Sequence, residues 1–176
     1  MLVRRAQHSR EVGGHAHAGS CVGFPDTGDT LGPVREQAVA AYLAMWHDDV
    51  IAARTADYRS VALARDAAGQ ALTLLVSGLR QQARNGIVIL GAPALDPHAT
   101  SVTVAHSVTT VTVTDCADGS RWLQYAQSGA RAGNGPAGRH KILASVQGID
   151  GTWRVASLDV QGPSTCLTSP RPSSSP

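Results

Sequence analysis

The chain has 176 residues, of which 43% are hydrophobic and 16% charged, and this length and composition suit one globular domain with terminal extensions. Fifteen Lys and Arg against thirteen Asp and Glu leave a net charge of +2, too small and too scattered for the basic stripe that binds nucleic acid. No apolar run reaches the length of a membrane-spanning helix.

The two ends of the chain read as extensions of that domain. Residues 1–32 are rich in Gly, His, Arg and Ser without hydrophobic periodicity, so we expect a flexible leader. It has no apolar segment typical of a signal peptide, although the small residues of AGSC leave lipidation of Cys21 open. The pair His15 and His17 is assigned to solvated coil. Residues 167–176 form a Pro/Ser tail, so the domain spans residues 33–166.

A long amphipathic helix is expected first. Pro33 suits a first helical turn, because its missing N–H would lack a partner there. Apolar residues then recur at three- and four-residue steps. This stripe consists of Val39, Tyr42, Leu43, Trp46, Val50 and Ala53. We expect Asp48 and Asp49 on a solvated face, because adjacent residues of a helix point in different directions.

A second helix is expected after a short connection. Asp66 suits its N-cap, and glycine in Asn85–Gly86 accepts the left-handed backbone that ends a helix. Its apolar stripe consists of Ala68, Leu72, Leu75, Val76 and Leu79.

From Ile87 the apolar period changes to two, which predicts strands. Ile87–Leu90 reads as an edge strand, because the prolines after it cannot donate to a central ladder. A short strand at 101–104 precedes the strand 108–116, and Asp118–Gly119 then predicts a hairpin turn that returns along 121–127.

Two further strands complete the predicted meander. The first alternates from His140 to Val146, and Asp150–Gly151 turns the chain into the second, 153–161. In that last strand Val155 is expected on one face, and the opposite face carries Ala156, Leu158 and Val160. Helices followed by an antiparallel meander predict an α+β domain, in which a curved sheet covers the N-terminal helices and encloses a cone.

The order of several segments carries a family resemblance. These segments are AYLAMWHDDVIAARTADYRSVALARDAAGQALTLLVSGL, GAPALDP, TDCADGSRWLQY, DGTWRV and a cysteine just past the last strand. Together they resemble a group of actinobacterial secreted or lipid-anchored proteins with a nuclear transport factor 2-like fold. The resemblance implies a cone-shaped domain, mostly of unknown function, and no catalytic residues to carry over.

The three cysteines lack the close spacing of zinc ligands, so no metal site and no cofactor is expected. Cys116 lies beside the predicted hairpin tip and Cys166 follows Val160 by six residues. Antiparallel neighbours can bring such strand ends within disulfide distance. We predict a Cys116–Cys166 disulfide with Cys21 unpaired, and buried free thiols are the alternative. A nucleophilic Cys116 would lack a neighbouring base.

Large amphipathic rings mark the cone interior as the place for a binding site. The pocket candidates are Tyr42, Trp46, Tyr58, Trp122 and Tyr125. The competing interpretation is that the same rings simply fill the core.

Three functions are compatible with the predicted fold, the predicted disulfide and the family resemblance. The first is a noncatalytic, secreted or envelope-associated domain that binds a small apolar ligand or a protein partner, with a cytoplasmic location as the alternative. The second is an enzyme similar to SnoaL-like polyketide cyclases and ketosteroid isomerases, for which Asp57 and Tyr58 are the suggestive pair. The third, implied by the resemblance, is a role in assembly or in a secretion complex, with a homodimer formed through the sheet face that carries Thr110, Thr112 and Thr114.

Overall fold

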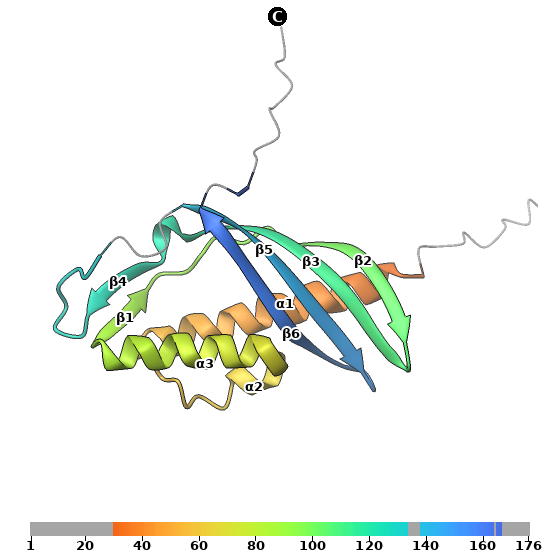
Figure 1. The fold of residues 1–176 in the computed structure, drawn as a ribbon, viewed down its shortest axis with the longest axis horizontal. Helices are drawn as coiled ribbons and strands as arrows, with labels where there is room; N and C mark the ends of the chain where they lie inside the picture. The colour runs from red at the N-terminus through yellow and green to blue at the C-terminus, as the bar shows by residue number, and fades with distance from the viewer. Residues whose placement is uncertain (1–29, 134–137, 164, 167–176) are drawn as a thin grey trace, which may run out of the picture.

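The computed structural model describes residues 30–133, 138–163, 165 and 166. Two long helices lie beneath a curved four-stranded sheet, and a two-stranded sheet extends from one end (Figure 1). The predicted α+β class, with N-terminal helices packed on a curved antiparallel sheet, is confirmed. The predictions for the leader before residue 30, with Cys21, His15 and His17, and for the tail after Cys166 lie outside the described residues.

Helix α1 (Gly32–Ala53) is the predicted first helix. Trp46 is 8% exposed within the core, whereas Leu43 is 41% exposed, so the buried face is rotated from the predicted stripe. The solvated face expected for Asp48 and Asp49 is wrong, because both carboxylates are buried. The buried residues of α1 are Ala38, Ala41, Tyr42, Met45, Trp46, Asp48, Asp49, Val50, Ala52 and Ala53.

Helix α3 (Gly69–Arg84) is the predicted second helix, but Asp66 does not cap it. Asp66 instead ends the short helix α2 (Leu63–Asp66). The start of α3 is fixed by the sheet, since the backbone N–H of Ala68 donates to the Val155 carbonyl at 2.9 Å. Beyond its end, Gly86 has a φ of +63°, the left-handed turn that its sequence predicts. Within the described residues, no helix has the length and apolar character needed to cross a membrane.

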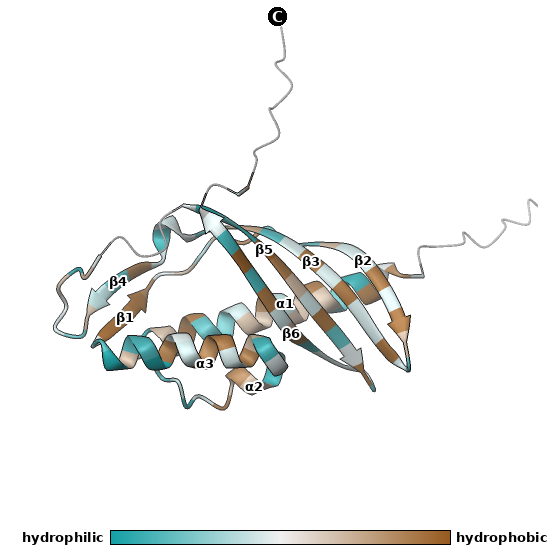
Figure 2. Cartoon of the chain, viewed as in Figure 1, coloured by the Kyte–Doolittle hydropathy of each residue, from teal (hydrophilic) through white to brown (hydrophobic). Residues whose placement is uncertain are grey.

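The four-stranded sheet is antiparallel throughout, in the order β2-β3-β5-β6. Its strands are β2 (His98–Ala105), β3 (Val108–Asp118), β5 (Arg139–Ile149) and β6 (Thr152–Pro163). Hydrophobic and polar residues alternate along these strands (Figure 2), because successive side chains of a strand point to opposite faces. The face turned toward the helices buries Val111, Val113, Ile142, Ala144, Val146, Val155 and Leu158.

A β-bulge in β6 overturns part of the predicted face pattern. Ser157 pairs with Ser145 and Val155 with Val146, so Ala156 is an extra residue between them. Val155 and Leu158 were expected on opposite faces, yet both are buried, because the extra residue reverses the alternation.

The predicted hairpin at Asp118–Gly119 is also wrong. The turn Gly119–Arg121 (η1) is a 3-10 helix, and β4 (Leu123–Ala126) pairs with β1 (Ile87–Leu90) in a separate sheet. Both edges of β3 are already occupied by β2 and β5, so the chain after the turn has no edge of β3 to return along.

A disulfide joins Cys116 of β3 to Cys166, as predicted, with Cα atoms 5.7 Å apart. The two cysteines are 50 residues apart in the chain, so the bond ties the segment after β6 to the end of β3. A cross-link over such a separation removes much of the conformational entropy of the unfolded chain.

Loss of this disulfide should lower the free energy of unfolding by about 4 kcal/mol. Urea unfolding with and without a reductant measures the difference. The double substitution Cys116→Ser with Cys166→Ser is the control, because its stability should not respond to reductant. Equal stability of the oxidised and reduced wild-type chains would contradict the expected role.

Candidate functional site

Three aromatic rings run from the core toward one end of the cone. Tyr42 and Trp46, one turn apart on α1, meet edge to face with ring centres 6.4 Å apart. Trp46 in turn meets Trp122, after η1, with centres 5.7 Å apart. Such T-shaped pairs are favourable because the positive edge of one ring faces the negative face of the other. The contact between Trp46 and Trp122 therefore joins α1 to the segment between the two sheets.

Tyr42 is held by a carboxylate inside the cone. Its hydroxyl donates to Asp115 Oδ2 at 2.9 Å, and the backbone N–H of Asp96 donates to Asp115 Oδ1 at 2.8 Å. Burial, followed by the negative charge of Asp115, raises the pKa of the Tyr42 hydroxyl well above its ordinary value. Tyr42 therefore stays a neutral donor, and each oxygen of the buried Asp115 carboxylate has a partner.

An apolar pocket of about 80 Å³ lies beside Trp46 and Trp122. The residues that line it are Trp46, Pro93, Ala117, Gly119, Trp122, His140, Ile142 and Val160. We call it the tryptophan pocket. Val160, 48% exposed, lies on its rim. The pocket therefore lies where α1, the segment 91–97 and the sheet meet.

A second hollow, of about 180 Å³, lies next to the tryptophan pocket. Trp46 and Pro93 line both, so these two side chains form the partition between them. The other residues around the second hollow are Leu43, His47, Val50, Ala92 and Leu95. Leu43, exposed on α1, belongs to this hollow rather than to the core.

Gly91 sets the position of the segment that frames both hollows. Its φ is +86°, and a Cβ atom there would collide with the carbonyl oxygen of Arg121. Only glycine allows this close approach of two backbones. Gly91 therefore lets Pro93 lie beside the turn that carries Trp122.

Three ring nitrogens of the pocket residues are buried without a hydrogen-bond partner among the described residues. They are Nε1 of Trp46, Nε1 of Trp122 and Nε2 of His140. His140 Nδ1 lies 3.1 Å from the Gln161 carbonyl oxygen; since a carbonyl only accepts, this bond places a proton on Nδ1. By contrast, Trp153 Nε1 donates to Gln37 Oε1 at 2.8 Å.

The structure brings together three of the five candidates that the sequence suggests, namely Tyr42, Trp46 and Trp122. Tyr58 lies elsewhere, in a hollow lined by arginines. Tyr125 pairs with Val88 in the two-stranded sheet and lines neither the tryptophan pocket nor the second hollow.

His140 and Asp115 were missed as candidates at the sequence level. Asp115 carried a detectable signal, since it shares the inward face of β3 with Val111 and Val113, and an acid at such a position needs a buried partner. His140 lies at the start of the alternating strand β5, but a lone histidine carries no signal of its own.

The two adjacent acids of α1 differ in their partners. Asp48 accepts from Arg65 Nη2 at 3.0 Å and 3.1 Å through its two oxygens. Asp49 is 5% exposed, and burial alone raises the pKa of its carboxyl to about 7. No group of three metal-ligating side chains occurs in the described part of the chain.

Comparisons with known proteins found matches among solved structures only. No family model matches the chain, and no match was found among curated proteins. The intermembrane space region of the chloroplast protein ARC6 has a TM-score of 0.45 and 15% identity, covering 73% of this chain and 96% of that one. A function-unknown protein from Mycobacterium tuberculosis has a TM-score of 0.40 and 18% identity, covering 75% and 76%.

A third solved structure, an NTF2-like protein from Cytophaga hutchinsonii, has a TM-score of 0.37 and 12% identity, covering 70% of this chain and 97% of that one. At these levels of similarity, the function has to be inferred from the residues of this chain.

The buried Asp49 should make stability depend on pH. Its pKa is higher in the folded chain than in the unfolded one, so stability is greatest at low pH and is lost as pH rises through about 7. Between pH 5 and pH 8 the free energy of unfolding should fall by about 2 to 3 kcal/mol from this group.

Urea unfolding across this pH range measures the effect. Asp49→Asn should remove the decline, whereas Asp159→Asn, at an exposed position of β6, should keep it. The same decline in Asp49→Asn as in wild type would show that another group causes it.

Proposed function

We propose that this chain is a noncatalytic, exported domain of the nuclear transport factor 2-like class, which binds a small apolar group in the tryptophan pocket. The observation that carries the proposal is the pocket of about 80 Å³ beside Trp46 and Trp122. Its wall brings together two indole rings, Pro93 and Ile142, and such apolar surfaces gain free energy when they exclude water.

The size of the pocket narrows the choice of occupant. Pockets that enclose a whole organic ligand measure roughly 300 to 1,000 Å³, whereas this one holds about 80 Å³. The occupant is therefore one apolar group of a larger partner, such as a branched aliphatic side chain or the end of an alkyl chain. The second hollow, which shares Trp46 and Pro93, extends the contact surface beyond that group.

The lining supports binding better than catalysis. Acid–base catalysis needs a titratable group within reach of the substrate, and His140 is the one such group around the tryptophan pocket. The buried carboxylates Asp49 and Asp115 are absent from this lining, and Asp115 is already bonded to Tyr42 and to the Asp96 backbone. Asp57, the acid of the suggestive pair, lies outside the pocket as well.

The disulfide between Cys116 and Cys166 supports export. Disulfides persist in secreted and envelope compartments, whereas thiols are kept reduced in most cytosols. A secreted or envelope location also fits the resemblance to actinobacterial exported proteins.

A small alcohol with a branched alkyl end tests the pocket directly. Isobutanol, titrated into uniformly ¹⁵N-labelled protein, should shift the indole N–H signals of Trp46 and Trp122 in a saturable way. The signal of Trp153 is an internal control, because its indole bonds to Gln37 and lines neither apolar hollow.

A substitution that fills the pocket completes the test. Ala117→Val adds two methyl groups to a buried lining residue and should abolish the saturable shifts. Ala105→Val makes the same change at the exposed end of β2 and should leave them intact. Shifts of equal size at Trp153, or persistence of the effect in Ala117→Val, would reject the tryptophan pocket as the binding site.

A further inference from the structure

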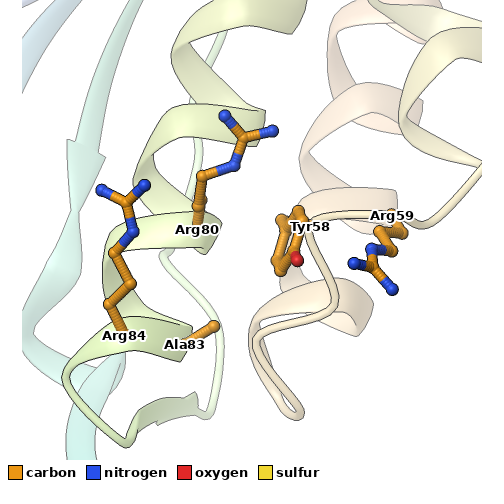
Figure 3. Close-up of a pocket in the computed structure, with 5 residues that line it drawn as sticks. All are labelled: Tyr58, Arg59, Arg80, Ala83 and Arg84. Atoms are coloured by element: carbon orange, nitrogen blue, oxygen red, sulfur yellow. The ribbon is translucent and has the colours of Figure 1, made fainter.

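We propose a second binding site, for a phosphate-bearing ligand, at the arginine hollow formed by Tyr58, Arg59, Arg80, Ala83 and Arg84. This hollow measures about 650 Å³ and lies between the C-terminal half of α3 and the loop 54–62 (Figure 3). It shares no residue with the tryptophan pocket or the second hollow, so the inference is independent of the function proposed above.

Tyr58 organises two of the three arginines. The guanidinium carbon atoms of Arg59 and Arg80 each lie 5.2 Å from the centre of its ring. Figure 3 shows the ring between these two side chains, one from the loop and one from α3. Cation–π contacts of this kind restrict long flexible side chains. Each guanidinium group is therefore held against the Tyr58 ring before any ligand binds, one on either side of it.

Arg84 adds a third positive charge. It follows Arg80 by four residues on α3, so both occupy the same side of the helix. Like charges at this spacing repel and destabilise a helix. Three such charges around one hollow are unfavourable until an anion neutralises them.

No acidic side chain lines the hollow. Among the described residues, none of these three arginines takes part in an ion pair. The ion pairs found there join Asp48 to Arg65 and to His47, and Asp96 to His98. The nearest acid along the chain, Asp57, uses Oδ1 to accept the Arg59 backbone N–H at 3.1 Å. The cluster is therefore not neutralised by the protein's own lining residues.

The loop that carries Tyr58 is itself held by backbone hydrogen bonds. Asp57 N–H donates to the Ala52 carbonyl at 2.9 Å, and Ser60 N–H donates to the Asp57 carbonyl at 3.2 Å. The first bond ties the loop to the end of α1, and the second closes a turn within the loop. The site is thus supported by the fold on the loop side and by α3 on the other.

The chemistry of the three side chains favours phosphate. A guanidinium group presents a planar fork of donors that matches the oxygens of phosphate or carboxylate. Three positive charges favour an anion that carries two charges over a single carboxylate. The hollow is larger than one phosphate, so it has room for an attached organic group, as in a phosphate ester or a phospholipid headgroup.

The binding experiment uses the full oxidised chain with inorganic phosphate and with glycerol 3-phosphate at constant ionic strength. Binding should be saturable, and the side-chain Nε–H signals of Arg59, Arg80 and Arg84 should shift. Arg80→Gln should weaken binding by about tenfold or more, because it removes a charged hydrogen bond. Arg80→Lys, which keeps the charge but loses the planar fork, should bind with intermediate affinity.

Arg139→Gln is the matched control, because it removes the same charge at an exposed position at the start of β5. Its affinity should equal that of wild type. Equal weakening in Arg80→Gln and Arg139→Gln would show a general charge effect and overturn the proposal. Absence of saturable binding to both soluble phosphates and vesicles would also overturn it.

Vesicles identify the source of the phosphate. Sedimentation with vesicles of phosphatidylcholine and phosphatidylglycerol, lost in Arg80→Gln, would assign the site to a lipid headgroup. Binding of glycerol 3-phosphate without vesicle binding would assign it to a soluble phosphate ester. Both results support a phosphate-bearing ligand. Circular dichroism of each variant checks that these exposed substitutions leave the fold intact.

Discussion

The hydrogen bond between Tyr42 and Asp115 is the contact on which the interior of the cone depends. It joins α1 to β3, and the second oxygen of Asp115 holds the backbone of Asp96. An unpaired polar group at this depth would cost free energy, so the pair fixes the rotation of α1 beneath the sheet. This rotation brings Trp46, one turn further along α1, to Trp122 and thereby forms the tryptophan pocket.

The same rotation has a cost in stability. Asp49, three residues after Trp46, is buried, and its raised pKa of about 7 means that its ionised form destabilises the fold. The two candidate sites differ in chemistry. The tryptophan pocket is apolar, whereas the arginine hollow is cationic.

Local pattern was enough to predict the helices, most strands and the Cys116–Cys166 disulfide, because periodicity and strand ends are visible within short segments. Strand pairing was not predictable where several strands compete for the same edge of a neighbouring strand. Asp118–Gly119 is a good hairpin sequence, but β3 has no free edge for the returning chain. The burial of Asp49 was not predicted, because the apolar stripe of a helix shows which face is buried but not how far the helix is rotated about its axis. A charged residue at the border of that stripe can therefore lie on either side. The arginine hollow joins a loop to a later helix, which no local motif records.

A double-mutant cycle on Tyr42 and Asp115 tests the central claim most directly. The free energies of unfolding of wild type, Tyr42→Phe, Asp115→Asn and the double variant yield the coupling between the two side chains. If their hydrogen bond fixes α1 on the sheet, the coupling should be about 1.5 to 3 kcal/mol, as expected for a bond to a charged group. A coupling near zero, with losses that simply add, would contradict the account.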